Sequence, residues 1–70
     1  MQFTDLYDKL LQGQQVRIMN TNTGGHIFFG ELSKLPHSIY EKICLADVER
    51  IYVFVQQDFN SYLVVEVYEE

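Results

Sequence analysis

The side chains that could carry out chemistry in this chain are two histidines, three serines and one cysteine. Nucleophilic catalysis needs a base beside the nucleophile, and a bound metal needs closely spaced ligands. His26, His37 and Cys44 show no close pairing of ligand types. No nucleophile motif surrounds the serines, which are Ser33, Ser38 and Ser61. The sequence therefore predicts a protein that is not an enzyme and holds no metal or cofactor, with both histidines at the surface.

A pair of glycines with threonines nearby, Gly24-Gly25, could form a loop that cradles a phosphate. Such loops need a lysine and a serine or threonine after the glycines, at the start of a helix. Here residues 26–28 follow, and their His-Ile-Phe sequence favours a strand. The pattern predicts a tight turn, since Asn and Gly tolerate positive φ. A small-ligand or nucleotide site near residues 21–26, between subunits, is kept as an alternative.

The charge balance argues against several partners. The net charge is −5, and the five basic residues are scattered: Lys9, Arg17, Lys34, Lys42 and Arg50. Binding to nucleic acid or to an anionic membrane depends on clustered Lys and Arg. We therefore expect no direct nucleic-acid contact and no membrane contact.

The acidic residues allow two interpretations. They could imitate DNA and capture a DNA-binding protein, or they could keep an aromatic-rich surface soluble. The notable acids are Glu41, Asp47, Glu49, Asp58, Glu66, Glu69 and Glu70. Glu66 lies between two valines of an apolar run, and this position predicts a carboxylate that points to solvent.

Cysteine usage and the lack of apolar segments predict the compartment. Cys44 is the single cysteine, so no internal disulfide can form, and its neighbours Ile43 and Leu45 predict a buried, inert thiol. No apolar run approaches the length of a membrane span, and the first residues lack the features of a signal peptide. We expect a soluble, cytoplasmic protein.

Two β-hairpins are predicted from β-branched and aromatic runs on either side of turn-forming residues. The C-terminal hairpin joins Ile51–Val55 to Tyr62–Tyr68, and the N-terminal one joins residues 15–19 to residues 26–32. Gly30, inside the second strand, suggests a bulge or a close backbone approach.

Helices are predicted in two places. Residues 4–12 should form the first, with Thr4 as its cap, an apolar stripe that includes Leu6 and Leu10, and Gly13 as its terminator. Pro36 predicts a short helical turn over residues 37–42. Residues 43–46 are ambiguous, and we expect them to be extended.

These elements predict one small α+β domain over residues 1–70, in which the N-terminal helix packs on a mostly antiparallel sheet of about four strands. Neither Ile51–Val55 nor residues 62–65 alternate between apolar and polar, as strands with one wet face do. One helix covers about one face of such a sheet. The second apolar face also needs a cover. We therefore expect either that the sheet curls toward a small barrel or sandwich, or that this face contacts another molecule.

The aromatic residues, five Phe and five Tyr, supply the candidate contacts. Phe28 and Phe29 are neighbours in a predicted strand, so they must point to opposite faces. Phe59 lies at a predicted turn tip. Because Phe and Tyr are frequent interface anchors, the candidate partner-binding residues are Phe28, Phe29, Tyr52, Phe54, Phe59 and Tyr62.

The order of features resembles a group of short phage- and mobile-element-encoded proteins of low-GC Gram-positive bacteria. The resemblance spans most of the chain: a capped N-terminal helix, a strand like 15–18, a turn with Gly, the segment Phe29-Gly30-Glu31-Leu32, Leu35-Pro36, and a last strand like 63–67. Residues 42–50 form a longer stretch than that pattern has. Some small acidic phage proteins inhibit host enzymes or defence complexes, so the resemblance implies a modulator of a host protein. No functional residues carry over.

The sequence thus predicts a non-catalytic protein-interaction module that self-associates as a homodimer and binds another protein. Two modes of contact are open: a partner covers the second sheet face, or it pairs with an edge strand. The alternatives are a ligand-binding protein with a site between subunits and an acidic DNA mimic.

Overall fold

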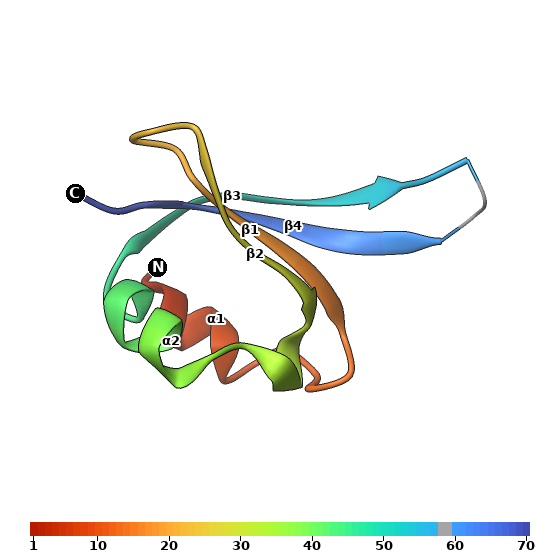
Figure 1. Cartoon of the computed structure of the whole chain (residues 1–70), viewed down its shortest axis with the longest axis horizontal. Coiled ribbons are helices and arrows are strands. Elements are labelled where there is room, and N and C mark those ends of the chain that lie inside the picture. Colours follow the sequence, from red (N-terminus) through yellow and green to blue (C-terminus); the bar gives the residue numbers. More distant parts are fainter. Residues whose placement is uncertain (58–59) are drawn as a thin grey trace.

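A computed structural model describes residues 1–57 and 60–70 of the chain. Two short helices lie together on one side of a four-stranded sheet (Figure 1). The elements in chain order are α1 (Phe3–Tyr7), β1 (Gln15–Asn20), β2 (Gly25–Glu31), the 3-10 helix η1 (Leu32–Lys34), α2 (His37–Ile43), β3 (Asp47–Val55) and β4 (Ser61–Tyr68). The predicted α+β class and both hairpins are confirmed.

The strand order is β2-β1-β4-β3, so the two hairpins lie side by side with β1 and β4 at the centre. β1/β2 and β3/β4 are antiparallel, whereas β1 and β4 are parallel, with Val16 opposite Leu63. The sheet is therefore mixed, and the sequence pattern did not predict its central pairing. The sheet is open and is not closed into a barrel, so β2 and β3 are both edge strands.

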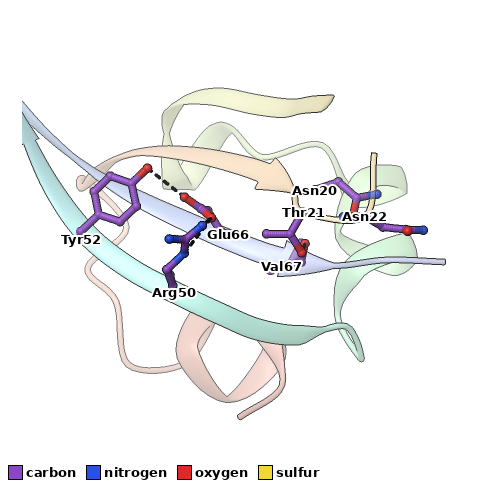
Figure 2. A network of polar contacts seen from close by, with 7 residues as sticks. All are labelled: Asn20, Thr21, Asn22, Arg50, Tyr52, Glu66 and Val67. Atoms are coloured by element: carbon purple, nitrogen blue, oxygen red, sulfur yellow. Dashed lines mark hydrogen bonds and ion pairs between the residues drawn. The ribbon is translucent and has the colours of Figure 1, made fainter. Parts of the chain in front are cut away.

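The turn after β1 holds the parallel pair together beyond the end of the strands (Figure 2). Thr21 donates its backbone N–H to the Val67 carbonyl at 2.8 Å. The side-chain amides of Asn20 and Asn22 donate to the Glu69 carbonyl at 3.2 and 3.1 Å. Gly24, with φ of 71°, completes the predicted tight turn. The turn residues thus bind the C-terminal strand as well as reversing the chain.

The core lies between the helices and one face of the two central strands. It contains Phe3, Leu6, Val16, Ile18, Leu32, Ile43, Val65 and Val67. The helices carry their buried residues at helical spacing, as Phe3 and Leu6 do. The two helices also touch each other, since the hydroxyls of Thr4 and Tyr40 lie 2.8 Å apart.

The first helix is shorter than predicted, and Thr4 is not its cap. The N-cap is Gln2, whose backbone N–H donates to the Asp5 carboxylate at 3.2 Å. The helix ends at Tyr7, and Leu11 is 78% exposed. The predicted extent to residue 12 is therefore wrong, although Leu6 is in the core and Leu10, beyond the end of the helix, still packs against it.

The other local predictions met mixed outcomes. Helix α2 covers the predicted residues 37–42 and continues through Ile43 into a turn, so the extended prediction for 43–46 is wrong. Ile43, and not Cys44, enters the core, and Cys44 is only half-buried. Gly30 has φ of 150°, and a Cβ there would lie 3.4 Å from the Phe28 ring. The close neighbour of Gly30 is thus a side chain, and Gly30 itself pairs in register with Val16; the register shift of this hairpin lies elsewhere, between Ile18 and Met19.

Candidate functional site

The most exposed apolar segment of the sheet is the second half of β3, Ile51–Val55, which we call the β3 arm. Ile51, Tyr52 and Phe54 are 42, 45 and 49% exposed, and Val53 and Val55 are 63 and 62% exposed. β3 pairs with β4 on one side, and its outer edge is bridged at its start, where Gln2 pairs with Asp47 and the Val48 N–H donates to the Met1 carbonyl at 2.8 Å. Within residues 1–57 and 60–70, no strand pairs with the outer edge of the arm itself. The arm therefore presents apolar side chains and unpaired backbone groups together.

The two faces of the arm are apolar in different ways. Ile51 and Val53 stand opposite Val65 and Leu63, so they share the face that the helices cover further along the sheet. The helices lie under only one half of the β3–β4 ribbon, and the arm extends past them (Figure 1). Ile51, Val53 and Val55 consequently form an uncovered aliphatic stripe. Tyr52 and Phe54 lie on the opposite face, which we call the open side.

The two halves of β3 differ in regularity and charge. The register with β4 shifts between Val48 and Arg50, which leaves Glu49 in a bulge. Asp47, Glu49 and Arg50 all lie in this first half. Bulges and charges are the usual devices that keep an edge strand from pairing with another chain. The β3 arm has neither, so it is the part of the edge that is free of such protection.

At the base of the arm, Glu66 is the centre of a polar network on the open side (Figure 2). Arg50 donates from Nε and Nη2 to Glu66 Oε1 at 3.1 and 2.9 Å. The Tyr52 hydroxyl donates to Glu66 Oε2 at 2.9 Å. This hydrogen bond to a carboxylate, followed by desolvation and the negative charge of Glu66, raises the pKa of Tyr52. The network fixes the side chains where the arm begins.

The prediction that Glu66 faces solvent is wrong. Glu66 is 9% exposed, because β4 is a central strand and Arg50 and Tyr52 fold over the carboxylate from β3. A buried carboxylate must keep its hydrogen bonds, and here both oxygens accept them. The Glu66 carboxylate therefore stabilises the pairing of β4 with β3 and is not part of an exposed acidic face.

An aromatic row crosses the open side further along the arm. The rings of Phe29 and Tyr62 meet edge to face with centroids 5.0 Å apart, and those of Tyr62 and Phe54 stack at 5.3 Å. Tyr62 is buried at 8% exposure, whereas Phe29 and Phe54 are each 49% exposed. Beside this row is a shallow hollow of about 410 Å³, lined by Gln15, Phe29, Gln56, Asn60 and Tyr62.

The structure brings four of the predicted contact residues together on the open side: Phe29, Tyr52, Phe54 and Tyr62. Phe28 lies on the other face and packs against the core, as neighbouring strand residues require. Phe59 lies outside the described residues. The sequence reasoning did not single out Ile51, Val53 and Val55, although the lack of alternation in Ile51–Val55 was the feature that could have marked them.

The residues considered for catalysis stand apart. His37 pairs with Glu41 at 2.8 Å on the exposed surface of α2, and His26 is exposed on β2. The Cys44 thiol contacts the Glu41 carbonyl at 3.6 Å. Among the described residues, no three His, Cys, Asp or Glu side chains gather where they could hold a metal ion. In the same part of the chain, no helix has the length and apolarity to cross a membrane.

Comparison with known proteins gave no relative. No protein-family model matches the chain, and the searches of curated proteins and of solved structures also found no match.

Proposed function

We propose that this protein is a non-catalytic interaction module that self-associates through the β3 arm. One observation carries the proposal: five consecutive apolar residues of the edge strand β3, Ile51–Val55, are each more than two-fifths exposed. An edge strand without bulge or charge is a template for strand addition. Burial of its apolar side chains would add hydrophobic stabilisation to the new main-chain hydrogen bonds.

The size of the protein supports the same conclusion. A chain of 70 residues has a small core, and small scaffolds commonly gain stability from a disulfide, a metal or a partner subunit. The lone Cys44 leaves no internal disulfide. A second subunit on β3 would supply apolar burial next to the existing core.

The open side offers a second, weaker candidate, a small-ligand site. Among the described residues, the hollow beside Phe29 and Tyr62 is lined by amides and aromatic rings and by no charged side chain. That lining suits an uncharged polar ligand with a flat ring, which would stabilise the folded protein in proportion to its affinity. A thermal shift with a panel of neutral metabolites tests this candidate.

An acidic DNA mimic is less well supported than either. Arg50 pairs with Glu66 inside the sheet. Arg17 on β1 is directly opposite Phe29 on β2, so the Arg17 side chain also lies on the open side. The open side therefore mixes both signs of charge and offers no acidic stripe. A host protein, which the resemblance to phage proteins implies, would be a further partner of the self-associated form.

The proposal is tested by measuring solution mass over a concentration series by sedimentation. We expect dimers in the wild type, and monomers with unchanged circular dichroism in Val53→Asp, because Val53 is 63% exposed. Leu11→Asp is the matched control, since Leu11 is exposed but lies in the loop after α1. It should remain dimeric. A wild type that stays monomeric at every concentration would refute the proposal.

A further inference from the structure

We infer that the β3 arm pairs antiparallel with the β3 arm of a second copy, with Val53 on the two-fold axis, to form one continuous eight-stranded sheet from the four strands of each copy. The inference rests on the proposed function and specifies its partner and geometry. It also places both helical layers on one side of the shared sheet and both aromatic rows on the other.

The symmetry of the apolar run gives the register. In an antiparallel pair related by a two-fold axis, residues opposite each other have side chains on the same face. With Val53 on the axis, Ile51 faces Val55 of the second copy and Tyr52 faces Phe54 of the second copy. Each of these pairs occurs twice, and aliphatic meets aliphatic while aromatic meets aromatic. Such cross-strand pairs are the ones that stabilise sheets.

Other registers match worse. Moving the axis to Tyr52 or Ile51 places Glu49 opposite Val55 or Val53, and moving it to Arg50 places two arginines face to face. Moving it to Phe54 places Ile51 opposite Gln57. Only the axis at Val53 pairs all five apolar residues of the arm with one another, since Val53 is the midpoint of the run. In this register Arg50 faces Gln56 and Glu49 faces Gln57, so no like charges meet.

The placement of the helices favours the same antiparallel arrangement. The helices cover the half of the β3–β4 ribbon away from the arm, which leaves the stripe of Ile51, Val53 and Val55 bare (Figure 1). In an antiparallel partner the helices lie at the opposite end of the shared ribbon. They then lie beyond the Val55 end of the first copy's stripe, and the reverse holds for the second copy. The two bare stripes therefore lie side by side between the two helical layers.

The irregularities of β3 limit the assembly to two copies. The bulge at Glu49 ends the regular edge on one side, and the strand ends at Val55 on the other. Because both copies use the same edge, the contact is isologous and leaves no second β3 for further addition. The remaining edge, β2, is interrupted by the positive φ of Gly30.

Disulfide trapping tests the register, in a Cys44→Ser background that removes the native thiol. Residues facing each other across an antiparallel pair have Cα atoms about 4.5–5.5 Å apart, within the range that a disulfide requires. We expect Val53→Cys to form a covalent dimer on oxidation. Ile51→Cys or Val55→Cys alone should not, because each would be roughly 14 Å from its copy along the strand. The double variant Ile51→Cys/Val55→Cys should form a covalent dimer again.

A charge pair tests the register without a covalent bond. Ile51→Lys/Val55→Glu places opposite charges across the interface twice, and we expect it to remain dimeric. Ile51→Lys/Val55→Lys places like charges there and should be monomeric at the same concentration. Both variants change the same two exposed positions, so circular dichroism should show both folded.

The outcomes separate this inference from the proposed function. A wild-type monomer overturns both. The inference alone is overturned if the wild type is a dimer, Val53→Cys is not trapped, and Ile51→Lys/Val55→Lys remains dimeric. The dimer would then use another surface, such as the aromatic rows packed face to face. Trapping of Ile51→Cys alone, without Val53→Cys, would overturn the register by moving the axis to Ile51.

Discussion

β3 and β4 are neighbouring strands of similar composition, but β4 is mostly buried and β3 is mostly exposed. Both are rich in Val, Tyr and other apolar residues, and they pair with each other along most of their length. In β4, Tyr62 and residues 64–67 are buried, whereas all residues of β3 from Glu49 to Val55 are exposed. Strand order makes the difference: β1 covers the second edge of β4, whereas among the described residues the second edge of β3 carries only the bridge of the N-terminal segment to Asp47 and Val48. Composition marked both strands as apolar, and only topology separates the strand that holds the fold from the strand available for binding.

The comparison is tested most strongly by one substitution in each region. Ile18 on β1 is fully buried in the core, while Ile51 on the β3 arm is 42% exposed. We expect Ile18→Ala to lower the free energy of unfolding by about 2–5 kcal/mol, because it leaves a cavity among well-packed side chains. Ile51→Ala should cost less than about 1 kcal/mol in the monomer. Urea denaturation at low protein concentration measures both.

Equal losses of unfolding free energy in Ile18→Ala and Ile51→Ala would contradict the difference between the core and the β3 arm. They would mean that the arm is as well packed in solution as the core. A loss in Ile51→Ala that grows with protein concentration would instead sharpen it, because it would place Ile51 in an interface between copies.

The adjacent residues Phe28 and Phe29 repeat the comparison on a single strand. Phe28 packs against the core and over Gly30, whereas Phe29 is 49% exposed on the open side. Phe28→Ala should cost about 3 kcal/mol, at the low end for a buried ring because Phe28 is only partly buried. Phe29→Ala should cost about 1 kcal/mol, mainly its edge-to-face contact with Tyr62. Thermal and urea unfolding compare the two, and a reversed order would contradict the assignment of faces.

Glu66 links the two strands, and its removal should have a smaller effect. Glu66→Ala leaves Arg50 and Tyr52 without their acceptor, and we expect a loss of about 2 kcal/mol, since hydrogen bonds to charged groups are the stronger ones. Glu66→Gln, the matched control, keeps the size and one acceptor and should lose about half as much. Chemical denaturation at neutral pH measures both. Wild-type stability in Glu66→Ala would show that burying the carboxylate costs as much as its bonds return.

The sequence was sufficient where structure depends on near neighbours. The turn before β2 follows from Asn20 to Gly25, the start of α2 follows from Pro36, and the opposite faces of Phe28 and Phe29 follow from the geometry of a strand. The end of α1 was wrong because tertiary packing ends a helix earlier than its apolar spacing allows.

The sequence was insufficient where structure depends on which strands become neighbours. The parallel contact of Val16 with Leu63 joins residues from the two hairpins, and no local pattern encodes it. The error at Glu66 has the same origin, because a charge between valines faces solvent on an edge strand and needs partners on a central one. The candidate site was found through its aromatic residues, whereas the aliphatic stripe centred on Val53 depends on the position of β3 at the edge.

The mildest test uses the hydroxyl that joins the arm to β4. The hydrogen bond to Glu66 raises the pKa of Tyr52 above its ordinary value of about 10. The folded state therefore holds this proton to a higher pH than the unfolded chain does. The stabilisation is fully present below about pH 10 and is lost as pH rises through the folded-state pKa. We expect Tyr52→Phe to be slightly less stable than wild type near neutral pH and to lose less stability on going to about pH 11.

Urea midpoints at about pH 8 and pH 11 measure this difference. Tyr68→Phe is the matched control, because Tyr68 is similarly exposed at 40% but lies at the other end of β4. Parallel alkaline losses in wild type and Tyr52→Phe would show that the hydroxyl does not hold the arm to Glu66 in solution. A smaller loss in Tyr52→Phe alone would show that the base of the arm is tied to the buried strand while the rest of β3 stays available for a partner.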